Sequence, residues 1–358
     1  MERPLFKPEG TPVEALDTPA LIVDLAALER NIETVHRVFR DGDRRLRPEV
    51  EVHRCPAIAQ MQLAAGGTVG GVCVTTLGQA EVFCANGISD VLLAGLVVTP
   101  SKLARLFALA RRATVTVAVD DEANVRQLSE AALASSAGVS VVVAVAARPE
   151  RIGVEPGPVA VALARAVADA EGLDFAGLMS HDPDATDGEV RRVLDTREMV
   201  ERAGMEVRVV SLSGASDYDV ATTMDGVTEV AAGSYALMDH NHRARHPELE
   251  PAARVMTTVT SVPAKGLAIT DGGHKSIGGD LGPPFVENVP GGRARGLSAE
   301  HFSIDLDSSS TTPPRVGDKV WLTPGDMGTC VNLHDYIHGV RDGRLEVVWE
   351  IAARGAYR

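Results

Sequence analysis

Two carboxylates and one imidazole alternate along a short segment near the start of the chain. Glu49, Glu51 and His53 stand at positions i, i+2 and i+4, around a β-strand that we expect over residues 50–53. Alternate side chains of a strand share a face, so these three should point the same way. Such a group is costly to bury unless protons, hydrogen bonds or a cation compensate its charge. The pattern therefore favours a functional cluster over a solvated polar rim.

Two kinds of chemistry suit this cluster. Like charges this close raise the pKa of one carboxyl group, which makes one an acid and the other a base. Alternatively, a divalent cation neutralises both, with Asp326, His301 and His334 as further ligand candidates. Oxygen ligands favour Mg²⁺ or Mn²⁺, whereas histidine or cysteine favours Zn²⁺. From the residues alone, both alternatives stay open.

Other polar residues follow predicted strands. Arg151 is a candidate to bind a substrate carboxylate through a bidentate pair. His181, directly after a predicted strand, is a candidate acid or base, although a loop histidine bonded to backbone is an equally good interpretation.

Strands and helices alternate through the first two-thirds of the chain, which is typical of parallel strands joined by crossover helices. The strand predictions cover residues 20–24, 50–53, 71–75, 91–94, 115–120, 139–145, 177–180 and 207–211. About eight such units predict an α/β fold with a (β/α)8 barrel over residues 1–250. Active sites of such barrels lie at the C-terminal ends of the strands, where Glu51 and its neighbours would stand.

The pattern changes near Pro251, where strands and turns replace the alternation. Strands are predicted at 255–262, 267–270, 303–306, 319–322 and 345–351, and a long loop at 278–296. Gly-Gly, Pro-Pro and Asp-Gly pairs punctuate these runs. We therefore expect a C-terminal β domain over residues 251–358.

Bulk properties limit the class of partner. The net charge of −14 would repel nucleic acids and anionic membranes. No apolar run approaches the roughly 20 residues of a membrane helix, and the N-terminus lacks the apolar core of a signal peptide. Four cysteines without CxxC spacing indicate reduced thiols. These features predict a cytoplasmic protein with a small-molecule substrate.

Several motifs together resemble one enzyme family. Residues 46–56, LRPEVEVHRCP, resemble the first catalytic strand of the D-threonine aldolase and D-serine dehydratase family, which usually reads R-P-H-x-K-T-H-K. Similar matches follow in order: DTPAL at 17–21, TLGQAE at 76–81, R-x-G-V at 151–154, E-x-x-x-G-S-Y at 229–235, DGGHK at 271–275, EH at 300–301, VGD at 316–318 and P-x-D-x-G-x-x-x-NLHD at 324–335. The resemblance implies an alanine-racemase-like barrel of the pyridoxal phosphate (PLP) fold type III. It also implies a C-terminal β domain and a head-to-tail homodimer. The positions that the resemblance implies for binding substrate or cofactor are Ser213, Gly214, Ser216, Gly233, Ser234, Tyr235 and Lys275.

The departures from the family pattern fall on the chemistry. Glu51 stands where the family has the lysine that forms the imine with PLP, and a carboxylate cannot form a Schiff base. The family's metal-binding pair is Asp326 and Gly328 here. Asp217 and Asp219 lie in the run that would hold the cofactor phosphate, which they would repel. These changes argue against PLP imine chemistry.

The function that we predict is a divergent lyase of the aldolase or dehydratase type, or an epimerase, acting on a small amino- or hydroxy-acid. Glu51 and Glu49 would supply acid/base chemistry, with a divalent metal as an optional partner. One alternative is a PLP enzyme whose cofactor is held noncovalently or by another lysine such as Lys275. Another is a non-catalytic ligand-binding protein.

Overall fold

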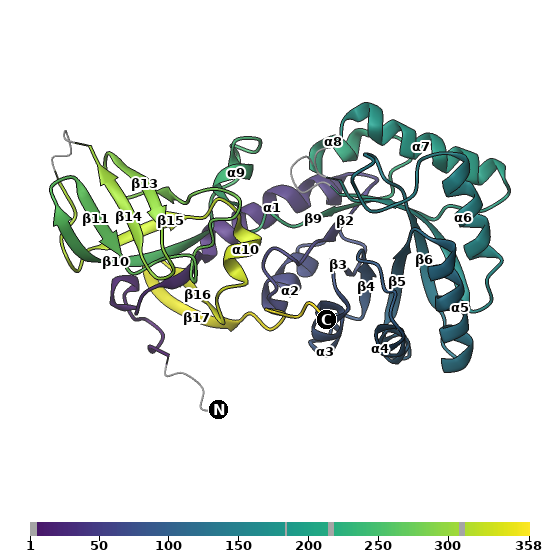
Figure 1. Cartoon of the computed structure of the whole chain (residues 1–358), viewed down its shortest axis with the longest axis horizontal. Coiled ribbons are helices and arrows are strands. Elements are labelled where there is room, and N and C mark those ends of the chain that lie inside the picture. The colour runs from purple at the N-terminus through teal and green to yellow at the C-terminus, as the bar shows by residue number, and fades with distance from the viewer. Residues whose placement is uncertain (1–5, 183–184, 214–217, 308–311) are drawn as a thin grey trace. The chain divides into compact units, whose positions relative to one another are not determined.

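The computed structural model describes residues 6–182, 185–213, 218–307 and 312–358 (Figure 1). The chain forms two compact units, and both are discontinuous in sequence. One comprises residues 1–34, 52–57 and 234–354, and the other comprises residues 35–51, 58–233 and 355–358. The domain boundary expected at residue 250 stays a prediction.

The second unit is built on eight parallel strands. They are β2 (Arg45–Pro48), β3 (Val72–Val74), β4 (Asp90–Leu93), β5 (Thr114–Val119), β6 (Val139–Ala144), β7 (Leu173–Ser180), β8 (Val209–Ser213) and β9 (Glu229–Ala232). Their order is β2-β9-β8-β7-β6-β5-β4-β3, and the parallel bridges Leu46–Thr68 and Glu49–Cys73 join the two ends. The predicted α/β barrel is therefore confirmed.

Helices follow the strands in the barrel sequence, and α4, α5 and α6 lie outside strands β4–β6 in Figure 1. The helices up to β9 are α1 (Leu25–Asp41), α2 (Pro56–Ala64), α3 (Leu77–Ala85), α4 (Pro100–Ala110), α5 (Glu122–Ser135), α6 (Pro158–Ala168), α7 (Asp187–Arg202) and α8 (Tyr218–Thr223). Side chains of Thr76, Thr99, Asp121 and Thr186 cap the N-termini of α3, α4, α5 and α7.

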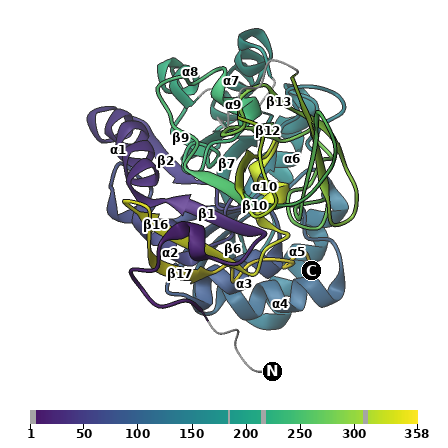
Figure 2. The ribbon, with the colours of Figure 1, turned by 90° about the vertical axis from the view of Figure 1, so that its left-hand side faces the viewer.

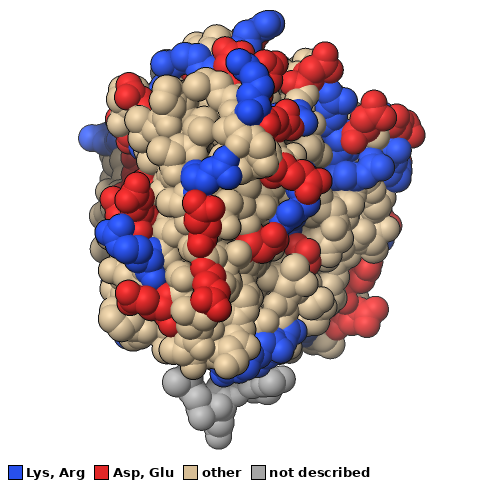
Figure 3. All heavy atoms as spheres, turned by 90° about the vertical axis from the view of Figure 1, so that its right-hand side faces the viewer, with Lys and Arg blue, Asp and Glu red and all other residues tan. Residues whose placement is uncertain are grey.

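Small side chains fill much of the barrel interior. One buried cluster consists of Cys73, Leu92, Ala118, Val142, Ala144, Ala176, Met179 and Ala231. Half of these residues are alanines, so inward-pointing groups at the strand ends have room around them. Outside the barrel, acidic and basic residues are interspersed over the face in Figure 3, without a region of one sign.

The other compact unit is a mainly antiparallel sheet. Its strands are β1 (Ala20–Asp24), β10 (Ala253–Ala264), β11 (Leu267–Thr270), β12 (Phe285–Val286), β13 (Gly292–Leu297), β14 (Phe302–Leu306), β15 (Lys319–Thr323), β16 (Tyr336–Arg341) and β17 (Arg344–Glu350). Short helices η1 (Val13–Ala15), α9 (His240–Arg243) and α10 (Met327–Val331) accompany it. The main path is β13-β14-β11-β10-β1-β16-β17, with β15 also on β10. Figure 2 labels β10, β1, β16 and β17 of this path.

Three of our strand expectations were wrong in detail. Residues 20–24 form β1, as predicted, but β1 pairs with β10 and β16 instead of entering the barrel. Residues 50–53 form a turn, because β2 ends at Pro48. The loop expected at 278–296 contains β12 and the start of β13. In the described residues, no helix has the length and apolar character needed to cross a membrane.

Candidate active site

The predicted shared face of Glu49, Glu51 and His53 does not exist, because only Glu49 continues the strand. Glu49 bridges to Cys73 after β2, and Glu51 lies in the turn that follows. His53 belongs to the other compact unit and is fully buried. Its Nδ1 accepts a hydrogen bond from the backbone N–H of Cys55 at 3.1 Å. The alternation rule failed because the strand ends before its second charged residue.

Glu49 is held at the end of β2 by backbone contacts. Its N–H donates to the carbonyl of Ala232 at 2.8 Å, and the N–H of Val50 donates to the carbonyl of Cys73 at 3.1 Å. Position 233 must be glycine, because a β-carbon there would lie 2.0 Å from the carbonyl oxygen of Glu49. Burial raises the pKa of the Glu49 carboxyl to about 7, and the charge of Glu51 adds to the shift. The charge of Glu51 therefore acts on Glu49 although the two residues do not share a strand.

An ionic group lies two residues before Glu49. Arg47 donates to both carboxylate oxygens of Glu229, at 2.9 and 3.0 Å, and to Asp90 at 2.7 Å. Arg47 and Glu229 are both buried. Burial lowers the pKa of Arg47, but its attraction to Glu229 and Asp90 outweighs burial and raises the pKa overall. The Arg47 guanidinium is therefore already bonded to the carboxylates of Glu229 and Asp90.

Glu49 also belongs to a mixed group of potential metal ligands. Ligand atoms of Glu49, Cys73 and His181 all lie within 4.8 Å of one another. Among the described residues, no other group of three or more His, Cys, Asp or Glu side chains comes this close together. Burial raises the pKa of the Cys73 thiol well above its usual value, with Glu49 adding to the shift. Burial lowers the pKa of His181 to about 4, helped by Arg47 and Arg151, so its imidazole is neutral near pH 7.

His181 follows directly after β7 and is oriented by its neighbours. Its Nε2 lies 3.3 Å from the hydroxyl of Ser211, and its carbonyl accepts from Nη2 of Arg151 at 3.0 Å. The next residue, Asp182, accepts two hydrogen bonds from Arg148, both at 2.7 Å. This bidentate pair fixes the chain beside His181. Arg151 is exposed, and among the described residues it forms no ion pair.

The predicted phosphate-binding residues have different surroundings. Ser213 is the last residue of β8 and is partly buried, whereas Gly214 and Ser216 lie outside the described residues. Ser234 and Tyr235 follow Gly233 in a turn, with exposed fractions of 6% and 1%. Tyr235 is therefore packed in the interior, which was one of the two roles that its sequence position allowed.

The predicted β-domain ligands do not come together as a set. Asp326 caps α10 by accepting from the N–H of Thr329 at 2.7 Å, and His301 is exposed. Nε2 of His334 donates to the carbonyl of Ser276 at 2.6 Å. Burial lowers the pKa of His334 to about 4. The family's metal pair therefore has no counterpart here, since Gly328 offers no side chain.

The lysines do not fit an imine with PLP. In the sequence of the barrel unit the single lysine is Lys102, in the first turn of α4. Lys275, the predicted substitute, forms a surface ion pair with Glu300 at 2.5 Å. Nζ of Lys319 donates to the Leu16 carbonyl and the Thr258 hydroxyl. A Schiff base at position 51 is excluded, because a carboxylate side chain cannot form one.

Cys73 is the site residue that sequence reasoning missed, because a cysteine within an apolar strand is usually core. Arg47, Glu229 and Asp90 were missed as well. A usable signal was present, since Arg47 and Glu49 are two residues apart and so share a strand face.

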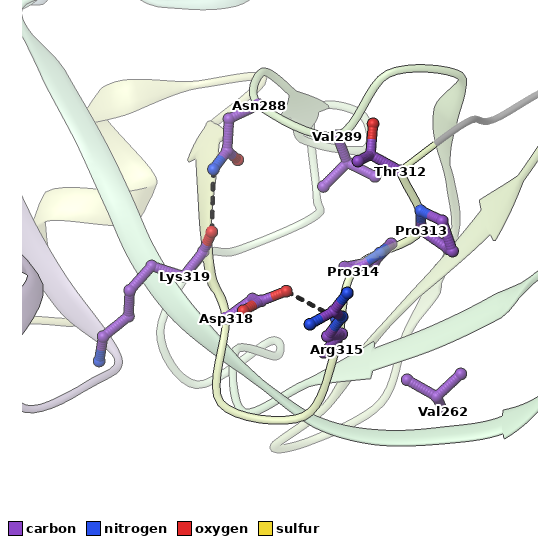
Figure 4. Close-up of a pocket in the computed structure, with 9 residues that line it drawn as sticks. All are labelled: Val262, Asn288, Val289, Thr312, Pro313, Pro314, Arg315, Asp318 and Lys319. Carbon is purple, nitrogen blue, oxygen red and sulfur yellow. Dashed lines mark hydrogen bonds between the residues drawn. The ribbon is translucent and has the colours of Figure 1, made fainter.

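A cavity of about 620 Å³ lies in the β domain, lined by residues such as Val262, Pro314 and Asp318 (Figure 4). Two of its polar side chains are already engaged. Asn288 donates to the carbonyl of Lys319 at 2.9 Å, and Asp318 accepts from the N–H of Arg315 at 2.7 Å. The amide and the carboxylate are therefore committed to backbone groups of the cavity wall.

Comparisons with known proteins agree with the fold. Residues 23–241 match the family of the alanine racemase N-terminal domain, and residues 252–340 match the putative serine dehydratase domain. D-threonine aldolase of Arthrobacter sp. is 33% identical, over 98% of this chain and 96% of that protein. The 3-hydroxy-D-aspartate aldolase of Paracoccus denitrificans (strain Pd 1222) is 32% identical, over 97% and 94%. The crystal structure of D-threonine aldolase from Filomicrobium marinum has a TM-score of 0.92 and 36% identity, covering 98% of this chain and 100% of that one.

Proposed function

Because this chain belongs to the D-threonine aldolase and D-serine dehydratase family, with its alanine-racemase-like barrel, we propose that it is a lyase that works without a PLP imine. Its substrate would be a small β-hydroxy amino acid, as the names of its relatives suggest. The observation that carries the proposal is the Glu49–Glu51 pair at the barrel mouth. Glu51 stands at the position of the family's imine lysine, and both carboxyl groups of the pair can exchange protons.

The proposed reaction is cleavage between Cα and Cβ of the substrate. Glu51 takes the proton of the β-hydroxyl group, the Cα–Cβ bond breaks, and an aldehyde leaves. The electron pair stays on Cα, which then receives a proton, so the second product is the shortened amino acid. Glu51 returns that proton, or Glu49 supplies one if it is protonated. Dehydration is the second outcome to be measured, since residues 252–340 match a putative serine dehydratase domain.

Arg151 and His181 complete the proposed site. The guanidinium of Arg151 has one N–H on the His181 carbonyl and is exposed. Its remaining N–H groups suit the substrate carboxylate. His181 is neutral near pH 7, because burial lowers its pKa to about 4, so it accepts or relays a proton without adding charge.

The test is an assay for aldehyde and for 2-oxo acid release from D-threonine and 3-hydroxy-D-aspartate, with and without added PLP. We expect product without PLP, and a loss of at least about 100-fold in Glu51→Gln, the scale of general acid–base catalysis. Glu171→Gln, an exposed carboxylate of the same unit, serves as the matched control. Activity that requires PLP, or full activity in Glu51→Gln, would overturn the role of this residue.

A further inference from the structure

We infer that Glu49, Cys73 and His181 form a binding site for a divalent transition-metal ion of the zinc class. The inference deepens the proposed function, on which it rests for the role of the site, by identifying what neutralises the carboxylates. The three residues come from the end of β2, from β3 and from the residue after β7. Their ligand atoms lie within 4.8 Å of one another.

The Glu49 carboxylate lacks a partner that would explain its position. Among the described residues, no hydrogen-bond donor and no basic side chain pairs with this carboxylate, and its neighbouring charge, Glu51, is repulsive. A carboxylate set into protein without compensation is costly. A bound cation supplies the missing compensation.

The guanidinium of Arg47, two residues before Glu49, cannot fill that role. Arg47 carries one positive charge and is held between Glu229 and Asp90, which carry two negative charges. With Glu49 and Glu51 added, four carboxylates face two guanidinium groups in this part of the barrel, since Arg151 also acts on His181. The excess of negative charge favours a divalent cation over a further anion or a neutral ligand.

The donor atoms specify the class of metal. One thiolate, one imidazole and one carboxylate suit Zn²⁺, Co²⁺ or Fe²⁺, whereas Mg²⁺ and Ca²⁺ prefer oxygen donors. Tetrahedral zinc with bonds of about 2.0–2.3 Å needs ligand atoms about 3.3–3.8 Å apart. Separations within 4.8 Å therefore close by side-chain adjustments of about 1 Å. Three protein ligands leave a fourth position for a substrate oxygen, as in catalytic zinc sites.

The backbone pre-positions the ligands. Glu49 and Cys73 are partners in a parallel bridge, so their side chains point to the same side, and Cys73 faces the barrel interior. Close packing of Gly233 against the Glu49 carbonyl fixes the first ligand. Arg151 and the Asp182–Arg148 pair hold the backbone of the third, His181. Such support around the ligands is what metal sites require.

The test uses the full chain without a polyhistidine tag, stripped with a chelator and titrated with Co²⁺ alone. We expect about one tightly bound ion per chain and a near-ultraviolet charge-transfer band from thiolate to cobalt. Cys73→Ser should abolish the band, and Glu49→Gln should weaken affinity by at least about 10- to 100-fold. Cys330→Ser and Cys84→Ser, which change the thiols of α10 and α3, should keep the band.

The outcomes separate this inference from the proposed function. No band, or a band lost in Cys330→Ser and kept in Cys73→Ser, would overturn the site. Cobalt binding at Cys73 in Glu51→Gln, with catalysis lost, supports both proposals. If the wild type binds cobalt but has no lyase activity, the metal site stands and the proposed lyase function is wrong. If the stripped protein is active and cobalt titration gives no band, the lyase function stands and the metal site is wrong.

Discussion

Gly233 and Glu49 approach so closely that the packing leaves no space for a side chain at position 233. A β-carbon there would lie 2.0 Å from the carbonyl oxygen of Glu49, at the point where β9 and β2 end. The relationship links the residue directly after the last barrel strand to the backbone of Glu49, whose side chain belongs to the candidate site. A substitution at position 233 therefore tests how the backbone holds Glu49 in place.

We predict that Gly233→Ala destabilises the protein by about 1–3 kcal/mol, the usual cost of forcing atoms into a packed interior. The backbone must move apart, which also stretches the bond from the Glu49 N–H to Ala232. Denaturant unfolding measures the cost. Gly188→Ala is the control, since nothing lies within 4 Å of its added β-carbon in α7. That change should be neutral or stabilising, and equal effects of the two would contradict the argument.

The buried Arg47–Glu229 pair yields a second prediction. Arg47→Leu leaves Glu229 buried without its partner, and we expect a loss of about 3–5 kcal/mol in the free energy of unfolding. Arg208→Leu breaks an exposed pair with Asp174 and should cost no more than about 1 kcal/mol. Adding Glu229→Leu to Arg47→Leu should recover part of the loss. If the double variant is less stable than Arg47→Leu, burial of an unpaired charge is not the cause.

Stability should depend on pH through His334. Burial lowers its folded pKa to about 4 from 6.5, so between these values the unfolded chain binds a proton that the folded chain does not. Stability therefore falls as pH decreases through this window, by on the order of 3 kcal/mol in total. Glu49 acts in the opposite sense, because its pKa of about 7 makes the folded state lose stability as pH rises from 4.5.

His334→Gln isolates the histidine contribution, since Glu49 is unchanged. Unfolding free energies of wild type and variant, measured above pH 6.5 and again midway through the window, should converge as pH falls. Glutamine still offers an N–H to the Ser276 carbonyl. A constant difference across the window would show that His334 is not titrating as described.

The lysine argument gives a spectroscopic prediction. Wild-type protein mixed with an equimolar amount of PLP should show no imine band, because Glu51 stands at the position of the family lysine and the barrel unit contains only Lys102, in the first turn of α4. Glu51→Lys supplies an amine at the family position and should gain a band that borohydride bleaches. A bleachable band in the wild type, mapped to Lys275, would instead support the alternative in which another lysine holds PLP.

Much of the fold was predictable because apolar runs and turn residues depend on local chemistry. Residues 267–270 form β11 as predicted, and the strands expected near 115–120 and 139–145 are β5 and β6. Pairing partners were less accessible, since they depend on contacts between distant segments. Residues 20–24 read as the first barrel strand, yet they pair with β10 and β16, and β9 is the eighth barrel strand.

The candidate site was predictable only in part. The Glu49–Glu51 interaction followed from their spacing of two residues, although the strand alternation expected for them was wrong, and the position of His181 after a barrel strand followed from the strand pattern. The end of β2 at Pro48 did not, so His53 was wrongly assigned to the same face. Cys73 could not be recognised as a neighbour of Glu49, because the parallel bridge joins segments whose register no local pattern fixes.

The position of β1 has a consequence for the order of synthesis. This strand is buried along most of its length and lies between β10 and β16, with Ile22 opposite both Arg254 and His338. A chain that emerges from the ribosome N-terminus first exposes this apolar segment until every barrel strand has been made. An unpaired apolar strand is a template for aggregation. Residues 20–24 therefore have no strand partner until residues 253–256 and 338–340 have been synthesised.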